Sequence, residues 1–369
     1  MTPLHGQVEP RFEPVRDAFA ANFTHQREVG AALCVYQHGR PVLDLWGGIA
    51  DVDSGAAWQG DTLSYVFSTT KGITATCAHL LVQRGLLDLD APVAEYWPEF
   101  AAESKAEIPV RSLLSHRAGL AALDTPVPLA AALDWHPMIT ALAAQRPAWT
   151  PGTAHGYHAQ TFGWLVGEVV RRVTGRTVGA FLAAEVAEPL GLDFHIGLPA
   201  SHEPRVGRLI LPPPTTTPDD APTLRRASGV TIPPIDPNDA NVHAAQIPSS
   251  NGIGTARAIA RLYAALIGEV DTIRLLTPAT LTAALRPHSD GPDLTLGFPT
   301  RFALGYALPS QAFPLFGPGS FGHGGRGGSI GCAHPPTGIT VGYVMNRLSH
   351  GVQTDTRFAN LAAAINACL

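Results

Sequence analysis

The chain has 369 residues, of which 45% are hydrophobic and 15% are charged, and its formal net charge is −5. This length and composition predict a folded globular protein with one large domain or two moderate ones, and they exclude a disordered chain. The negative charge gives no electrostatic reason to expect nucleic acid or an anionic membrane surface as a partner.

The N-terminal segment has no basic region followed by an apolar stretch, and the sequence contains no apolar span long enough to cross a bilayer. The four cysteines, Cys34, Cys77, Cys332 and Cys368, are widely scattered, which predicts reduced thiols rather than a disulfide framework. We therefore expect a cytoplasmic protein.

The first quarter of the chain carries the patterns of a helix, a hairpin and a second helix. Apolar residues at helical spacing predict an amphipathic helix over residues 12–24. Two short apolar strands, Ala32–Tyr36 and Pro41–Trp46, are joined by a short Gly-containing turn, so we expect a β-hairpin. A long apolar helix is expected from Ser68 to about Arg84, where a glycine follows.

The central part of the chain is mainly helical in pattern. A helix with one apolar stripe begins near Gln160, and two more are expected over residues 255–267 and 278–286, the last with Thr277 as its cap. Between them, residues 199–248 form a Pro-rich segment without a regular pattern, which is typical of a functional lid or a mobile loop.

The C-terminal part returns to strands. Ser329–Ala333 and Ile339–Met345 flank a Pro-Pro-Thr-Gly turn and predict another hairpin. Residues 354–367 predict a closing helix, and we find no internal repeats.

Strands at both ends with helices between them indicate an α+β fold, an α/β sandwich in which one antiparallel sheet is formed by the N- and C-terminal segments and flanked by helices. We expect residues 1–70 and 295–369 to form this sheet domain. Residues 71–294 are expected to form an inserted, mainly helical domain that includes the lid-like segment 199–248, and the whole is expected to be one catalytic module.

One of the two lysines forms a chemically suggestive pair with a serine. Only two of the 25 Lys and Arg residues are lysines, and one of them, Lys71, stands three residues after Ser68. At the start of a helix this Ser-x-x-Lys spacing places hydroxyl and amine on one face, one turn apart. An amine with a lowered pKa can then take the serine proton and make a nucleophile, which arginine cannot do because it stays protonated. Coding bias also explains scarce lysine, so the pair needs further support.

Tyr157 lies in a turn-rich loop directly before the predicted helix at Gln160. A phenol there could share the proton transfer with Lys71, since tyrosinate is a competent base when nearby positive charge lowers its pKa. Taken alone, the residue fits better as a tyrosine that packs beneath a loop.

The segment Phe321–Ser329 contains five glycines beside a predicted strand. Such glycines let a substrate approach the backbone closely, and an edge strand with free N–H groups can supply half of an oxyanion hole, the Ser68 N–H being the other half. His323 could donate a hydrogen bond to substrate or to Tyr157. The alternative is a flexible Gly-rich turn with an ordinary loop histidine.

A second serine motif, Gly-x-Ser-x-Gly at residues 327–331, matches the nucleophile elbow of α/β-hydrolases. That fold requires an acid and then a histidine after the serine. The only downstream carboxylate side chain is Asp355, no histidine follows it, and the pattern around Ser329 is strand–turn–strand. We therefore do not expect Ser329 to be the nucleophile.

Metal chemistry has weak support in the sequence. His323, Cys332 and His334 could meet in space, but no His-Glu-x-x-His or paired Cys-x-x-Cys spacing is present. We predict neither a metal site nor another cofactor.

Taken together, the Ser-x-x-Lys pair, Tyr157 and the Gly-rich strand resemble the serine β-lactamase/penicillin-binding-protein superfamily, in particular its class C-like branch, which includes the family VIII carboxylesterases. The resemblance extends from about residue 12 to residue 365 and includes the stretches at 85–93 and 108–120. The Pro-Gly-Thr before Tyr157 and the Pro-Pro-Thr-Gly turn also match. The resemblance implies a β-lactamase/transpeptidase-like fold.

The resemblance also implies roles for individual residues. It implies Ser68 as the nucleophile, Lys71 as its base partner and Tyr157 as a second acid/base. The family's Lys/His-Thr-Gly motif falls on three residues of the Gly-rich strand, His323, Gly324 and Gly325. The N–H of the next residue, Arg326, would complete the oxyanion hole.

Two departures bear on the substrate. Ala159 stands where the β-lactamases usually have an Asn, and Gly324 replaces the usual Thr. Both changes remove polar contacts to a lactam or peptide amide. We therefore expect a serine hydrolase that cleaves small-molecule carboxylic esters, with small or short acyl chains, through an acyl-Ser68 intermediate. The alternatives are a β-lactamase or D-amino-acid peptidase, an acyltransferase on the same machinery, and a catalytically inactive scaffold. The sequence leaves the oligomeric state open.

Overall fold

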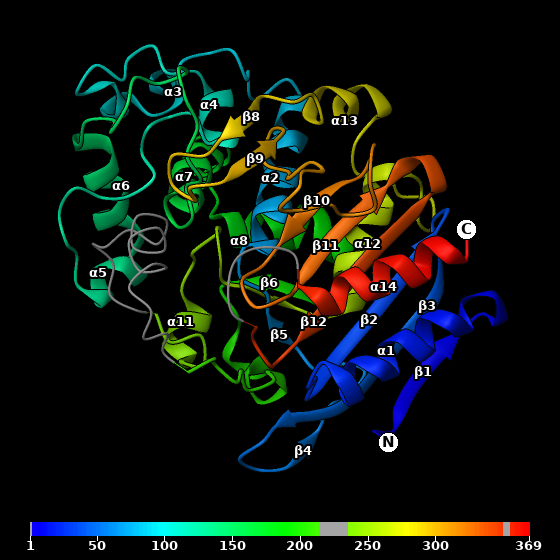
Figure 1. Ribbon diagram of the computed structural model, residues 1–369. Helices are drawn as coiled ribbons and strands as arrows, with labels where there is room; N and C mark the ends of the chain where they lie inside the picture. The colour runs from blue at the N-terminus through cyan, green and yellow to red at the C-terminus, as the bar shows by residue number, and fades with distance from the viewer. Residues whose placement is uncertain (1, 214–234, 350–354) are drawn as a thin grey trace.

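The computed structural model describes residues 2–213, 235–349 and 355–369 (Figure 1). Within these residues the main feature is a seven-stranded antiparallel sheet in the order β1-β3-β2-β12-β11-β10, with β4 paired to β3. Its strands are β1 (Leu4–Val8), β2 (Gly30–Gln37), β3 (Arg40–Asp51), β4 (Ala56–Ala57), β10 (Phe321–Gly324), β11 (Ile330–His334) and β12 (Ile339–Met345). The two ends of the chain meet in the middle of this sheet, where β2 pairs with β12.

The sheet separates two hydrophobic cores, because successive side chains of a strand point to opposite faces. Leu33 belongs to the core beneath α1 (Glu13–His25) and α14 (Thr356–Ala367), which pack against each other (Figure 1). The next residue, Cys34, belongs to the other core, where α12 (Ala256–Ile267) lies on β2, β11 and β12. The sheet is thus covered by helices on both faces.

A glycine allows the close packing of α12 on the sheet. A Cβ atom on Gly342 of β12 would lie 2.1 Å from the carbonyl oxygen of Ala256, so any larger residue would push the helix away. Thr255 caps the start of this helix, because its side chain accepts a hydrogen bond from the Ala258 N–H. A cap of this kind contributes about 1 kcal/mol and fixes where the helix starts.

The other large element is α2 (Thr69–Gln83), which runs between the sheet and the helical region (Figure 1). Its residues from Thr69 to Leu81 are all buried, and it packs against α7 (Thr161–Thr174), α8 and β10. The other α-helices of the described residues are α3 (Val93–Tyr96), α4 (Val110–Leu114), α5 (Leu129–Leu133), α6 (Trp135–Ala144), α8 (Val178–Leu182), α9 (Glu188–Leu190), α11 (Ala240–Ala244) and α13 (Pro278–Ala284). Shorter helical turns are η1 (Pro10–Phe12), η2 (Pro98–Ala101), η3 (Ala183–Ala187), η4 (Ala200–Arg205) and η5 (Pro335–Thr337).

In the part of the chain that the structure describes, two small sheets lie beside the large one. One has the order β5-β7-β6 and is formed by β5 (Ser64–Tyr65), β6 (Phe194–Ile196) and β7 (Gly252–Gly254). The other is the hairpin of β8 (Ser289–Pro292) and β9 (Pro299–Phe302). The first of them leads directly into α2, because β5 ends three residues before Ser68.

The structure confirms the α+β fold predicted from the sequence, with one antiparallel sheet built from both ends of the chain. The helices α1, α2, α7, α12, α13 and α14 and both hairpins occur where they were predicted. Strand β3 runs five residues beyond Trp46, where the prediction ended, because Gly47 and Gly48 interrupt the apolar pattern without ending the strand. Thr277 caps α13 by accepting from the Thr280 N–H, as predicted.

The prediction of an irregular segment over residues 199–248 is wrong for part of its length. The described part contains η4 and α11, the latter capped by Asp239, whose side chain accepts from the Asn241 N–H. Residues 214–234 lie outside the described residues. The lid function and the division at residues 71 and 294 stay predictions, and α12, although inside the range predicted as helical domain, packs on the sheet.

Two further expectations concern membranes and thiols. In the three described ranges, no helix is long and apolar enough to cross a membrane. All four cysteines are free and buried. Their state agrees with the prediction that their wide spacing does not form a disulfide framework.

Candidate active site

Ser68 lies where the small sheet passes into the central helix. After β5, the Val66 N–H extends the pairing with β7 by donating to the Gly252 carbonyl at 2.9 Å. Phe67 then has a φ of 47°, a left-handed conformation that costs a non-glycine residue roughly 1–3 kcal/mol. This turn places Ser68, which is half-buried, at the N-cap of α2.

Lys71 follows one helical turn later and is completely buried. Its Nζ lies 3.1 Å from Ser68 Oγ, and it donates to the carbonyls of Ala159 at 2.6 Å and Ser249 at 2.9 Å. Burial lowers the pKa of Lys71 well below its ordinary value, because the charged form loses its hydration.

The three partners of Lys71 decide what its amine can do in each protonation state. As an ammonium it donates to all three, the Ser68 hydroxyl at 3.1 Å and the two carbonyls. As a neutral amine it keeps two donors for the carbonyls and can turn its lone pair to the Ser68 hydroxyl. The arrangement therefore suits an amine that takes a proton from Ser68.

Tyr157 lies beside this pair. The Lys71 Nζ is 4.9 Å from the centre of the Tyr157 ring, and the phenol hydrogen-bonds to the Ser68 side chain. Burial raises the pKa of the Tyr157 phenol, and the hydrogen bond with Ser68 only partly opposes this effect. The sequence analysis considered a tyrosinate with a lowered pKa, and the shift is in the opposite direction. Tyr157 is therefore placed to donate and relay a proton rather than to act as a resident anion.

A buried carboxylate holds the Tyr157 loop. Asp293 Oδ1 accepts from the backbone N–H groups of Tyr157 at 3.0 Å, Thr295 at 2.9 Å and Leu296 at 2.9 Å, and Oδ2 accepts from the Thr300 hydroxyl at 3.0 Å. Three backbone donors on one carboxylate oxygen make a strong, charge-assisted cluster. Asp293 thus fixes the position of the Tyr157 backbone.

Aromatic rings hold the Tyr157 side chain itself. The ring stacks on Phe302 with centroids 5.7 Å apart and an angle of 15° between planes, and His116 packs against it at 4.9 Å. Because Phe302 lies on β9 and Asp293 in the turn between β8 and β9, one hairpin positions both the backbone and the ring of Tyr157.

The Gly-rich segment packs directly against the turn that carries Ser68. A Cβ atom on Gly325 would lie 2.2 Å from both the Val66 carbonyl oxygen and Ser329 Oγ, so only glycine fits there. Ser329 is buried, donates to the Val66 carbonyl at 2.8 Å and lies 3.3 Å from Thr69 Oγ1. Ser329 therefore joins two loops, as expected of a serine that is not the nucleophile.

Two backbone N–H groups at this junction, those of Ser68 and Arg326, have no hydrogen-bond partner among the described residues. In contrast, the Gly325 N–H donates to the Ser329 carbonyl at 2.7 Å. Free N–H groups at a helix start and at the end of an edge strand are the donors that an oxyanion hole needs. Gly324, at the end of β10, has no side chain that could cover these donors. The space beside it is open, because the nearest atom to a Cβ atom placed there would be 3.8 Å away.

His323 lies on β10 beside Tyr157, with the two rings 6.0 Å apart. Its Nδ1 faces the Gly324 carbonyl at 2.8 Å and so carries the proton, while the buried Nε2 has no hydrogen-bond partner among the described residues. Burial lowers the pKa of His323 to about 3. His323 therefore offers a neutral acceptor to a bound molecule, and not the donor considered in the sequence analysis.

A buried ionic network supports the Gly-rich segment from behind. Arg357 on α14 donates to the Gly327 carbonyl at 2.6 Å, to Asp355 at 2.8 Å and to both Glu28 oxygens at 3.1 Å. Tyr343 also donates to Glu28. Burial raises the pKa of Glu28 to about 7, although Arg357 opposes this shift. The network thus holds the Gly327 carbonyl, which belongs to the residue after Arg326.

The trio His323, Cys332 and His334 does not gather. His323 pairs with Gly331 across β10 and β11, so its side chain lies on one face of the sheet and those of Cys332 and His334 lie on the other. A different group of potential metal ligands, Asp193 with two histidines, is present in the described part of the chain.

Sequence reasoning placed Ser68, Lys71, Tyr157 and the Gly-rich segment, and the fold brings these together. It missed the Ser249 carbonyl, Asp293 and Arg357. No local pattern marks them, because each of their contacts joins a backbone group to a residue that is distant in the sequence.

Fold and site together are those of the β-lactamase/transpeptidase-like class of serine enzymes. The Beta-lactamase family profile matches residues 15–364. The chain belongs to the Beta-lactamase family, which confirms the resemblance inferred from its motifs.

Similar proteins include both esterases and penicillin-related proteins. The chain is 41% identical to "Esterase/beta-lactamase LipL" of Mycobacterium tuberculosis over 374 residues, which cover 95% of this chain and 85% of that protein. It superposes on the crystal structure of a family VIII carboxylesterase with a TM-score of 0.92 and 40% identity, over 100% of both chains. A penicillin-binding protein homolog from Caulobacter crescentus superposes with a TM-score of 0.93 and 37% identity, also over 100% of both chains.

Proposed function

We propose that this chain is a serine hydrolase that cleaves small-molecule carboxylic esters through an acyl-enzyme on Ser68. The observation that carries the proposal is the surroundings of Lys71, a buried amine with two carbonyl partners and the Ser68 hydroxyl at 3.1 Å. The names of its similar proteins, an esterase/β-lactamase and a family VIII carboxylesterase, support the ester as the substrate class.

In the acylation step, neutral Lys71 takes the proton of Ser68 as Oγ attacks the ester carbonyl carbon. The resulting oxyanion lies between the N–H groups of Ser68 and Arg326. Tyr157 gives its proton to the leaving alkoxide and is reprotonated from the Lys71 ammonium, so that the alcohol departs and Lys71 is neutral again.

In the deacylation step, a water molecule attacks the acyl carbonyl and passes a proton to the Lys71–Tyr157 pair. The second tetrahedral intermediate uses the same two N–H donors. When it collapses, the proton returns to Ser68 Oγ and the carboxylic acid leaves. The balance is one ester and one water for one acid and one alcohol.

Two positions favour the ester over a lactam or peptide. Ala159 contributes only its backbone carbonyl, which Lys71 uses, and Gly324 has no side chain. An amide substrate would find no polar side chain at either position, whereas an ester carbonyl needs only the two N–H donors.

The test is hydrolysis of short-chain aryl esters by the parent protein and by Ser68→Ala and Lys71→Ala, with mass spectrometry of the acylated protein. We expect loss of turnover in both variants and a single acylation site on Ser68. Lys105→Ala is the matched control, because Lys105 is equally buried and its amine donates to the Ala102 and Ala143 carbonyls but to no serine. Retained turnover in Ser68→Ala, or acylation elsewhere, refutes the proposal.

Lactam hydrolysis is the second candidate, favoured by the names of the M. tuberculosis relative and the penicillin-binding protein homolog. A chromogenic cephalosporin assayed beside the esters separates the two functions. An added acceptor alcohol, with product analysis, detects acyl transfer. We expect ester hydrolysis to exceed both by at least about tenfold in kcat/KM.

We also propose a cytoplasmic location, which the four free buried thiols support. Cell fractionation followed by immunodetection tests it. Detection in the periplasmic or extracellular fraction contradicts it.

A further inference from the structure

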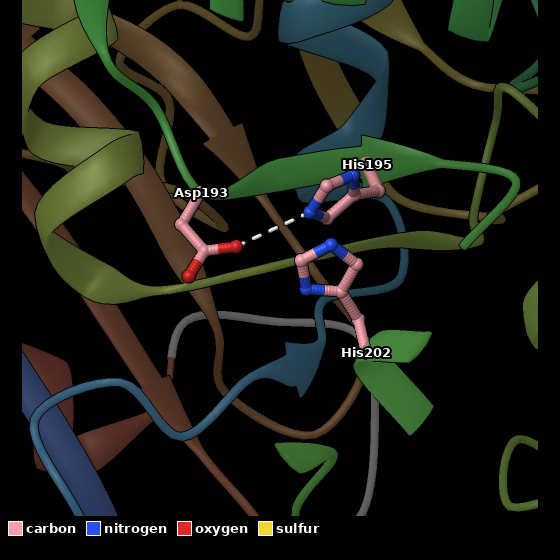
Figure 2. Close-up of side chains that lie close together, drawn as sticks. All are labelled: Asp193, His195 and His202. Carbon is pink, nitrogen blue, oxygen red and sulfur yellow. Dashed lines mark hydrogen bonds and ion pairs between the residues drawn. The ribbon is translucent and has the colours of Figure 1, made fainter. Parts of the chain in front are cut away.

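Asp193, His195 and His202 form a cluster on the small sheet next to η4 (Figure 2). Asp193 directly precedes β6 and His195 lies within it, so the two side chains share one face of the strand. His202 reaches the same place from η4. All three residues are partly exposed, which leaves access for an ion.

The ligand atoms of this cluster are close to the spacing of a zinc site. Metal–ligand bonds of about 2.0–2.1 Å in a tetrahedron put the ligand atoms about 3.3 Å apart. Asp193 Oδ1 and His195 Nε2 are 3.2 Å apart, and the three ligand atoms all lie within 4.8 Å of one another. A small rotation of the His202 side chain therefore closes the site, and solvent supplies a fourth ligand.

Arg205 competes with an ion for this cluster. It forms an ion pair with Asp193 Oδ2, which leaves Oδ1 for a metal. Its Nη1 also lies 3.1 Å from His202 Nδ1. Whichever ring nitrogen binds the ion, this second contact must break, because Nδ1 becomes either metal-bound or protonated. Arg205 then keeps its contacts with Asp61.

We propose that Asp193, His195 and His202 bind a divalent transition ion of the zinc type. Two imidazoles and one carboxylate are ligands that zinc prefers, whereas Mg²⁺ requires oxygen ligands. The ion replaces the His195–Asp193 hydrogen bond, and the His195 proton moves to Nδ1 through water. It would join β6 to η4, whose last residue, Arg205, accepts from the Leu63 N–H at 2.8 Å. The ion therefore braces the segment that leads to Ser68.

The test is isothermal titration of Zn²⁺ into metal-free protein that was purified through a tag without histidine. We expect one equivalent to bind to the parent protein, binding at least about tenfold weaker in His195→Ala and His202→Ala, and no comparable binding of Mg²⁺. The matched control is His136→Ala, because Asp134 and His136 have the same Asp-x-His spacing but lie exposed. Absence of one tight equivalent in the parent, or binding in His195→Ala equal to that of the control, overturns the proposal.

Arg205→Gln keeps all three ligands and removes the competing charge, so it decides the question even if an alanine variant unfolds. We expect Zn²⁺ to bind about tenfold more tightly to this variant. Unchanged or weaker binding contradicts the proposal. A thermal unfolding series gives a second readout, because an ion that binds only the folded state raises Tm with concentration in the parent and in His136→Ala, but not in His195→Ala. Neither readout uses ester turnover, so this proposal and the proposed hydrolase function fail independently.

Discussion

Replacing Asp293 tests whether the β8–β9 hairpin positions the acid/base tyrosine. Asp293→Ala leaves three backbone donors without an acceptor, the N–H groups of Tyr157, Thr295 and Leu296. The Thr300 hydroxyl still has a partner, because His155 Nε2 lies 2.9 Å away. Each buried donor without a partner costs about 1–3 kcal/mol, so the loss is roughly 3 kcal/mol or more. This is a large share of the 5–15 kcal/mol that typically stabilises a folded domain.

The loss of position is expected to appear in kcat more than in KM, because the role proposed for Tyr157 is to protonate the leaving group. A displacement of about 1 Å costs about 100-fold in rate, so we expect a fall of about that size in Asp293→Ala. In Asp293→Asn the amide oxygen still accepts the three N–H bonds and its NH₂ faces Thr300. We therefore expect a loss of less than tenfold in kcat and roughly 2 kcal/mol in stability, since neutral acceptors make weaker bonds.

The assay is steady-state hydrolysis of an aryl acetate together with urea unfolding of each variant. Asp290→Ala is the matched control, because Asp290 lies in the same hairpin and makes only an exposed ion pair with Arg301. Such a pair contributes less than about 1 kcal/mol. If folded Asp293→Ala keeps a kcat within about twofold of Asp290→Ala, Asp293 does not position Tyr157.

Three further predictions concern the base, the Gly-rich loop and the buried network. Burial lowers the pKa of Lys71, so kcat/KM should rise with pH until this amine is neutral and then level off. In Lys71→Arg, kcat/KM should be at least about 1000-fold lower at every pH of the profile, because guanidinium stays protonated. Gly325→Ala should lower kcat by about 100-fold, because its Cβ would lie 2.2 Å from the Val66 carbonyl oxygen and displace the loop. Gly324→Ala should lower kcat far less, because the space around its Cβ is open. Equal losses of kcat in the two variants contradict the steric argument. The pKa of Glu28 is raised to about 7 in the folded protein. Between its unfolded and folded pKa, the folded state therefore holds a proton that the unfolded state has lost. The free energy of unfolding should fall by up to about 3 kcal/mol as the pH rises from 4.5 to 7. Glu28→Gln should flatten that fall in urea unfolding at a series of pH values, and an unchanged slope contradicts it.

The parts of the site that could be predicted are those carried by local spacing. Ser68 and Lys71 are one helical turn apart, so the helical pattern alone brings their side chains together. The glycines near Gly325 mark close backbone contact wherever they occur in a strand. Tyr157 was recognisable only because its loop ends in a predicted helix and because the family order of motifs includes a tyrosine there.

The parts that could not be predicted act through backbone groups or across long sequence separations. The carbonyls of Ala159 and Ser249 orient Lys71 from 88 and 178 residues away, and a carbonyl is the same in every residue type. Asp293 reaches the Tyr157 N–H across 136 residues. Arg357 reaches the Gly327 carbonyl from the closing helix, where its position in the sequence pattern is that of an ordinary charged residue. Only the fold shows that these groups meet.

Substrate preference follows from what the site lacks as much as from what it contains. Family members of the lactam type usually carry an Asn at the position of Ala159, a Thr at that of Gly324, and a Lys or His at that of His323. Here the first two positions have no polar side chain, and burial keeps the pKa of His323 near 3, so this residue is a neutral acceptor at physiological pH. β10 then offers neither a cation for a carboxylate nor a side-chain amide contact. In the proposed mechanism a neutral ester needs only the N–H groups of Ser68 and Arg326 and a proton from Tyr157, so it loses nothing by these changes.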